Sequence, residues 1–178
     1  DDDGATWAVV QENLASGAPI TALAVDSLLK SKPATGDVIY AGTAGAGVFW
    51  SSNGGGSWQQ ISEGLANKHL LSLAIAVSPG RVQRLFAGTA AGAFSLDTSQ
   101  LPETVVTWQS VLQLPAGEIR ALAVGNPPST VYAITPDSIF KSSDGGEKWT
   151  ELGEAALAAF DIDLQALALP PGKAANTV

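Results

Sequence analysis

The feature of this sequence that most constrains its fold is a repeat of about 46 residues. Three similar apolar segments, 38–43, 84–89 and 130–135, carry an aromatic residue at positions 40, 86 and 132, each 46 residues after the one before. A fixed period of this length is typical of repeat architectures, in which each unit buries its apolar face against its neighbours. The chain is therefore expected to be an array of similar small units.

The repeat unit contains four short predicted strands. An apolar first strand occurs four times, at 20–25, 71–77, 119–124 and 164–169, and proline or glycine follows each copy. Such near-continuous apolar runs indicate strands buried on both faces. The aromatic segments supply the second strand, residues 47–51, 93–95 and 138–142 the third, and Trp58, Trp108 and Trp149 open the fourth. Four strands in about 46 residues predict an all-β fold: a β-propeller, or propeller segment, of about four four-stranded blades.

A glycine-rich turn joins the third strand to the fourth. It reads SSNGGGSW at 51–58 and SSDGGEKW at 142–149, and a clipped copy, DDDGATW, opens the chain. The pattern Ser-x-Asp-x-Gly-x-x-Trp resembles the Asp-box, or BNR, repeat of sialidases, xyloglucan-hydrolysing glycosidases, sortilin-type receptors and photosystem II assembly factors. The matching residues are Asp2, Gly4, Trp7, Ser51, Asn53, Gly55, Trp58, Ser142, Asp144, Gly146 and Trp149.

The resemblance implies a propeller fold and a structural role for this turn. Asp and Ser side chains accept hydrogen bonds from the N–H groups of the turn, glycine adopts a positive φ without strain, and the tryptophan buries a large apolar face. Because the families that share the turn perform unrelated functions, it indicates the fold and not the activity.

The repeat also predicts the domain organisation. We expect one propeller, or propeller segment, over residues 1–178, with blades at about 20–65, 70–114 and 119–154 and a split blade made of 164–178 and 1–14. The chain contains no Met, so we expect it to lie within a longer precursor or to follow a removed segment. Two interpretations remain open. The chain is part of a longer array, or two copies complete one ring by self-association through open blade edges.

Composition excludes several classes of function. Nine Lys and Arg against 17 Asp and Glu give a net charge of −8, which disfavours binding to nucleic acid or to anionic membranes. The chain has no Cys and one His, which excludes disulfides and the common cysteine or multi-histidine metal sites. Asp1–Asp3 with Glu12 do not form a calcium loop, because Ala5 and Thr6 replace a ligand and the required glycine. We expect no cofactor and no metal.

Catalytic candidates are few. Asp161 and Asp163 alternate on an extended segment, which would place their carboxylates about 7 Å apart, near the separation that glycosidases use. The competing interpretation is two solvated loop carboxylates that flank a buried Ile162. Glu118 is a third candidate, since glycosidases of the fold that the chain resembles take their two carboxylates from different blades.

Two further residues stand out. His69 is interpreted as a loop residue, because no Ser-His-Asp arrangement accompanies it. Trp50 falls where Lys141 stands in the third unit, so its side chain is expected to point outward and to contact a sugar, a protein or the edge of its own blade.

These observations favour a non-catalytic recognition or scaffold module that binds a protein or a polysaccharide, and that is extracellular, periplasmic or lumenal. The alternative is a fragment of a secreted glycoside hydrolase that resembles the xyloglucanases, with Asp161, Asp163 and Glu118 as its candidate carboxylates. A second alternative is a protein like the photosystem II assembly factors. The resemblance implies a basic patch for those factors, whereas this chain is acidic.

Overall fold

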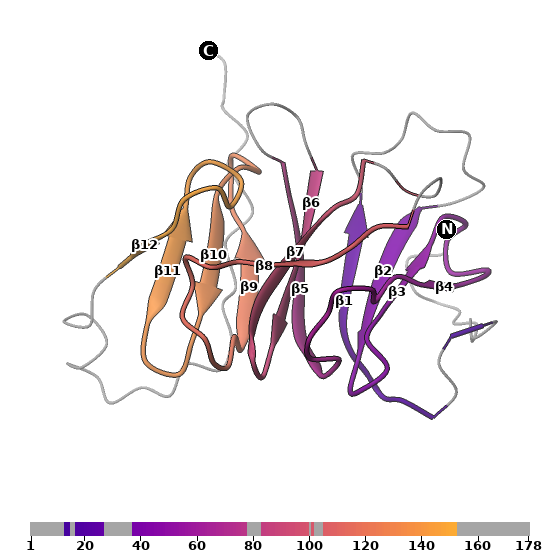
Figure 1. Ribbon diagram of the computed structural model, residues 1–178. Coiled ribbons are helices and arrows are strands. Elements are labelled where there is room, and N and C mark those ends of the chain that lie inside the picture. Colours follow the sequence, from indigo (N-terminus) through magenta and orange to yellow (C-terminus); the bar gives the residue numbers. More distant parts are fainter. Residues whose placement is uncertain are drawn as a thin grey trace, which may run out of the picture.

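A computed structural model describes residues 13–14, 17–26, 37–77, 83–99, 101 and 105–152. These residues form twelve strands in three four-stranded antiparallel sheets (Figure 1). Sheet 1 contains β1 (Ile20–Asp26), β2 (Val38–Thr43), β3 (Val48–Ser51) and β4 (Gln59–Gln60). Sheet 2 contains β5 (Leu70–Val77), β6 (Gln83–Thr89), β7 (Gly92–Asp97) and β8 (Gln109–Ser110). Sheet 3 contains β9 (Ala121–Val124), β10 (Val131–Ile134), β11 (Ile139–Ser142) and β12 (Thr150–Glu151).

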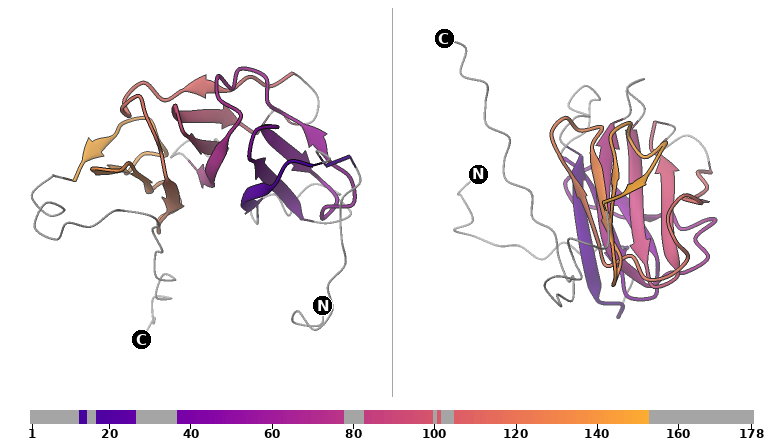
Figure 2. Two further views of the ribbon diagram at one scale, coloured as in Figure 1. Left: turned by 90° about the horizontal axis from the view of Figure 1, so that it is seen from below. Right: turned by 90° about the vertical axis from the view of Figure 1, so that its left-hand side faces the viewer.

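The sheets confirm the predicted all-β fold of a β-propeller segment. Within each sheet the strands lie in chain order, from a first strand to a short fourth strand opened by a tryptophan. The three sheets fan out side by side, and β5 lies between β1 and β9 and contacts both (Figure 2). Most of the predicted split blade, residues 1–12 and 164–178, lies outside the described residues.

The apolar cores lie between sheets, and not within them. The larger core joins one face of sheet 1, with Tyr40 and Val48, to one face of sheet 2, with Leu73, Leu85 and Trp108. Other clusters join sheet 2 to sheet 3, through Phe86, Leu122, Val131 and Trp149 among others. Burial of one large apolar side chain contributes about 1.5–3 kcal/mol, so each sheet depends on its neighbour for most of its stability.

Trp50 corrects one expectation. Its side chain is buried, at 9% exposure, in the core between sheets 1 and 2. It lies opposite Tyr40 in the register of β2 and β3, as Lys141 lies opposite Tyr132 in sheet 3. Sheet 2 covers this face of sheet 1, whereas no described sheet covers the corresponding face of sheet 3. The predicted outward orientation was therefore wrong for Trp50, because the side chain meets the adjacent sheet.

The first strands also differ from the prediction of burial on both faces. β5 is largely buried, but β1 alternates between exposed and half-buried residues, and β9 is half-buried throughout. Only β5 has a described sheet on both sides. Within the described residues, no helix is long and apolar enough to span a membrane.

Candidate functional site

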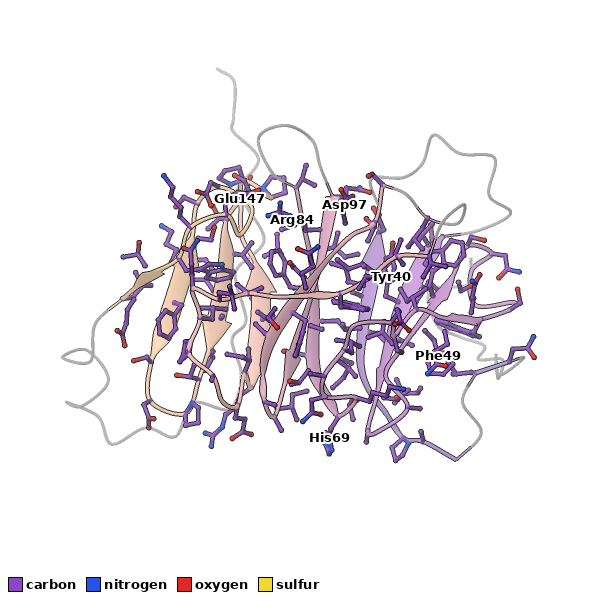
Figure 3. All side chains as sticks on the ribbon, in the orientation of Figure 1. Tyr40, Phe49, His69, Arg84, Asp97 and Glu147 are labelled. Carbon is purple, nitrogen blue, oxygen red and sulfur yellow. The ribbon has the colours of Figure 1, made fainter. Side chains whose placement is uncertain are left out.

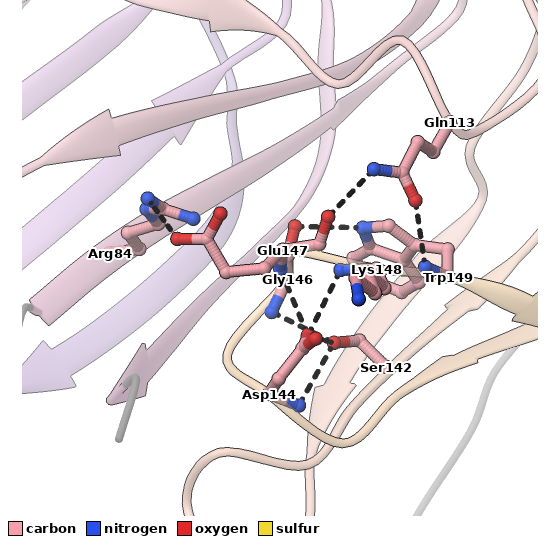
Figure 4. A network of polar contacts seen from close by, with 8 residues as sticks. All are labelled: Arg84, Gln113, Ser142, Asp144, Gly146, Glu147, Lys148 and Trp149. Carbon is pink, nitrogen blue, oxygen red and sulfur yellow. Dashed lines mark hydrogen bonds and ion pairs between the residues drawn. The ribbon is translucent and has the colours of Figure 1, made fainter. Parts of the chain in front are cut away.

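The turn between β11 and β12 is built around one serine and one carboxylate. The Ser142 hydroxyl donates to Asp144 Oδ1 (2.8 Å) and accepts from the Gly146 N–H (2.8 Å), and Asp144 Oδ1 also accepts from the N–H groups of Glu147 and Lys148 (3.0 Å each) (Figure 4). Burial acts to raise the pKa of the Asp144 carboxyl. The hydrogen bonds from Lys148, Ser142 and Glu147 outweigh this effect and hold the pKa below its ordinary value of 3.8.

The turn between β3 and β4 repeats this geometry without a charge. The Ser51 hydroxyl donates to Asn53 Oδ1 (2.9 Å) and accepts from the Gly55 N–H (2.9 Å), and Asn53 Oδ1 accepts from the Ser57 N–H (2.9 Å). The Asn53 amide also donates to the Ser57 hydroxyl (3.0 Å), a partner that Lys148 does not provide in the other turn. Each side chain thus satisfies the N–H groups of its own turn, which is a structural task.

The turn between β11 and β12 also contacts sheet 2 through a group of residues that we call the clasp: Arg84, Phe86, Gln113, Glu147 and Trp149. The Phe86 and Trp149 rings meet edge to face with centroids 6.0 Å apart. Arg84 of β6 pairs with Glu147 (2.6 Å). The Gln113 amide donates to the Glu147 carbonyl (2.7 Å) and accepts from the Trp149 N–H (3.0 Å) (Figure 4).

A groove of about 480 Å³ lies beside this clasp and is lined by residues of sheet 2 and by Gly146 of the sheet 3 turn. Its polar side chains come from β6, β7, β8 and their flanking residues: Arg84, Ser95, Asp97, Thr107, Gln109, Ser110 and Gln113. The exposed apolar residues Val105 and Leu112 also line it. This volume lies within the range of small-ligand sites, about 300–1,000 Å³.

Of the three sequence-predicted catalytic residues, the structure describes only Glu118. Glu118 forms an ion pair with Arg120 at 3.4 Å, and Asp161 and Asp163 lie outside the described residues, so the prediction for these carboxylates stays a prediction. No group of three or more His, Cys, Asp or Glu residues that could hold a metal ion occurs within the described part of the chain. His69 lies at the end of the sheets opposite Arg84, Asp97 and Glu147 (Figure 3).

Sequence reasoning did not find the groove or the residues of the clasp. Glu147 was part of a quoted turn, but its partner Arg84 is 63 residues away in the chain, and Gln113 is 34 residues from Glu147. The repeat contains no signal for such pairs, because sheet 1 has Val38 and Gly56 at the positions of Arg84 and Glu147.

Similarity to solved structures supports the propeller fold. No model of a known protein family matches the sequence, and no curated protein matches it. Among solved structures, an ancestral GH74 enzyme superposes with a TM-score of 0.54 and 22% sequence identity over 82% of this chain and 20% of its own. The GH74 xyloglucanase from Xanthomonas campestris gives a TM-score of 0.42 and 21% identity over 65% of this chain and 18% of its own. The chain thus spans about a fifth of the length of these enzymes.

Proposed function

We propose that this chain is a non-catalytic recognition segment of a β-propeller, and that it binds a neutral glycan in the groove that sheet 2 and Gly146 form. The observation that carries the proposal is the groove lining. Ser95 and Gln109 lie opposite each other on one face of sheet 2 and provide both donors and acceptors, as sugar hydroxyls require, and Asp97 adds an acceptor. The charge of Arg84 is matched by Glu147, so the site favours an uncharged ligand over a phosphate or a uronic acid.

The surroundings of the groove fit a binding role. Gln113 and the Arg84–Glu147 pair hold sheets 2 and 3 together beside it, so its walls are fixed before a ligand arrives. The rim residues Val105 and Leu112 are 85% and 90% exposed and offer apolar contacts to sugar C–H groups. The GH74 neighbour shares the fold alone at 22% identity.

Calorimetric titration with neutral and with acidic oligosaccharides tests this function. Neutral glucan oligomers should bind, and uronic-acid oligomers should bind more weakly. Gln109→Ala should reduce the affinity by about fivefold to tenfold, the effect of one lost hydrogen bond. Gln59→Ala is the matched control, because Gln59 holds the same register position in sheet 1 as Gln109 in sheet 2. Binding that is absent, or equally affected by the two variants, would reject the groove as a glycan site.

A second function is supported by the likeness to a GH74 enzyme. In this interpretation the chain is part of a glycoside hydrolase, with Glu118, Asp161 and Asp163 as its carboxylates. Release of reducing ends from soluble polysaccharides measures this directly. Hydrolysis that Glu118→Gln, Asp161→Asn or Asp163→Asn abolishes would support the enzyme, and the absence of hydrolysis in the unmodified chain would reject it.

We also infer that the two serine turns are Asp-boxes. Their repeated hydrogen bonds, from the Gly55 N–H to the Ser51 hydroxyl and from the Gly146 N–H to the Ser142 hydroxyl, support a structural role for them.

A polysaccharide ligand further favours an extracellular, periplasmic or lumenal location. Cell fractionation of the native protein tests this, because recovery in the cytosol alone would contradict it.

A further inference from the structure

One face of sheet 1 is covered by no other described sheet. This face, here called the open face, contains Leu23, Val25, Ile39, Phe49 and Trp58 in the register of β1 to β3 and the following turn. Its outer residues Phe49 and Trp58 are buried, and its exposed part lies on β1. Leu23 is 64% exposed and Val25 is 55% exposed. The first strand of each sheet, β1, β5 or β9, is here called its inner strand. Two neighbouring apolar side chains of the inner strand β1 thus face solvent, which marks an interaction surface.

The corresponding face of sheet 2 is buried. Leu73 lies opposite Ala87 as Leu23 lies opposite Ala41, but Leu73 is only 8% exposed because sheet 1 covers it. The residue type and the register are the same in the two sheets. The exposure of Leu23 therefore reflects a neighbouring sheet that the described residues do not supply.

The two interfaces inside the chain show what such a neighbour looks like. Ala22 and Ala24 of β1 pack on the core that contains Leu73. Ala76 of β5 packs on the cluster that contains Leu122 and Val124. In both interfaces, alanines of one inner strand meet branched apolar side chains of the next, so the complement of Leu23 and Val25 is an alanine-rich inner strand.

The outer part of the open face makes one contact of the kind that a neighbouring sheet would make. Leu14 packs with Phe49 and Trp58, as Leu65 shares a core with Trp108. The Trp108 indole N–H donates to the Ile61 carbonyl of sheet 1. Trp58 Nε1 is buried and has no hydrogen-bond partner within the described part of the chain. Within the described residues the outer contact is thus present, whereas a polar partner for Trp58 and a first strand against Leu23 and Val25 are not.

The chain contains one more segment of the required type. Residues 164–169, LQALAL, repeat the alternation of β1 and β9, with Ala166 and Ala168 at the places of Ala22 and Ala24. This segment follows sheet 3, and sheets 1 and 3 lie at opposite ends of the fan with sheet 2 between them (Figure 2). The described chain before this segment thus ends in sheet 3, which lies farthest from sheet 1 in the fan.

We propose that the open face of sheet 1 binds residues 164–169 of a second copy of this chain. Reciprocal docking then joins two copies at two identical junctions, which closes a two-fold symmetric assembly without free inner strands. Each junction repeats the contact of alanines on branched side chains that the chain already makes between its own sheets.

Light scattering over a range of protein concentrations provides the first test. The unmodified chain should have the mass of a dimer. Leu23→Asp should shift it to the mass of a monomer with an unchanged circular dichroism spectrum, since this exposed side chain contributes little to the fold of one copy. Leu112→Asp, at the 90% exposed rim of the groove, is the matched control and should remain dimeric. A monomeric unmodified chain, or a dimeric Leu23→Asp variant, would overturn the proposal.

Cross-linking identifies the occupant. The chain has no Cys, so the thiols of the double variant Val25→Cys and Ala168→Cys are the only ones that the reagent can link. A short bismaleimide should link two chains of this double variant and leave Leu112→Cys combined with Ala168→Cys unlinked. A link confined within one chain would show that the segment docks on its own sheet 1, and a failure to link would point to another occupant. Either result would overturn the dimer.

Discussion

At the scale of single residues, the same turn is built once with a carboxylate and once with an amide. Asp144 accepts two backbone N–H bonds, which stabilise its charged form. Because its pKa in the folded chain lies below 3.8, the carboxylate contributes stability above the pKa of the unfolded chain. This contribution is lost as the pH falls through the lower folded value. Asn53 does not titrate, so its side chain contributes the same stability at every pH.

Asp144→Asn should therefore cost about 0.5–1 kcal/mol near neutral pH, a small value because the side chain is accessible to solvent. The difference from the unmodified chain should shrink as the pH falls below about 4. Urea denaturation at pH 7 and pH 3 measures it. The second substitution Lys148→Ser should restore part of the loss, since it recreates the pair of Asn53 with Ser57. A cost that is independent of pH would contradict the role of the charge.

Gly146 shows why the turn needs glycine. Its φ is +89°, and a Cβ at this position would overlap the Phe86 ring. Gly146→Ala should destabilise the chain by about 2–4 kcal/mol, from backbone strain together with the displaced ring. Gly45→Ala is the control, with a φ of +119° and no heavy atom within 4 Å of the added Cβ. It should cost less, about 1–2 kcal/mol. Equal losses in guanidinium denaturation would show that the contact with Phe86 is unimportant.

At the scale of elements, the stability of a strand depends on the sheet that covers it. Leu73→Ala should cost about 2–4 kcal/mol, because it leaves a cavity between sheets 1 and 2. Leu23→Ala, at the same register position of β1, should cost less than about 1 kcal/mol in dilute solution because its side chain is exposed. Denaturation at low protein concentration compares the two variants. A large effect of Leu23→Ala would mean that the open face is covered within one chain.

This dependence also explains how far the sequence could predict the structure. The strands and the serine turns follow from local periodicity and turn chemistry, so their places were predictable from residues such as Tyr40, Trp58 and Asp144. The orientation of Trp50 and the exposure of Leu23 were not, because each depends on whether another sheet lies beside it. The groove was hidden for the same reason, since Arg84, Gln109 and Gly146 meet across two units. Periodicity describes one unit, whereas the candidate site belongs to the junction of two.

At the scale of the whole molecule, sheet 2 connects the others. Leu85 of β6 points into the core shared with sheet 1, and the next residue, Phe86, contacts the clusters shared with sheet 3. Both side chains are fully buried. Because the cores lie between sheets, no sheet keeps a large apolar interior once its neighbour unfolds, and the described sheets are expected to unfold together.

Hydrogen exchange of the Leu85→Ala variant tests this coupling. The variant removes apolar contacts between sheets 1 and 2 and should cost about 2–4 kcal/mol. If the sheets form one cooperative unit, the slowest amides of β2, β6 and β10 should lose protection by the same amount, although β10 lies in sheet 3 and is not part of the core that contains Leu85. Phe86→Ala should produce the same uniform loss from the other side of β6. Protection retained in β10 of the Leu85→Ala variant would instead indicate that each pair of sheets opens separately, as in repeat arrays whose neighbouring units are weakly coupled.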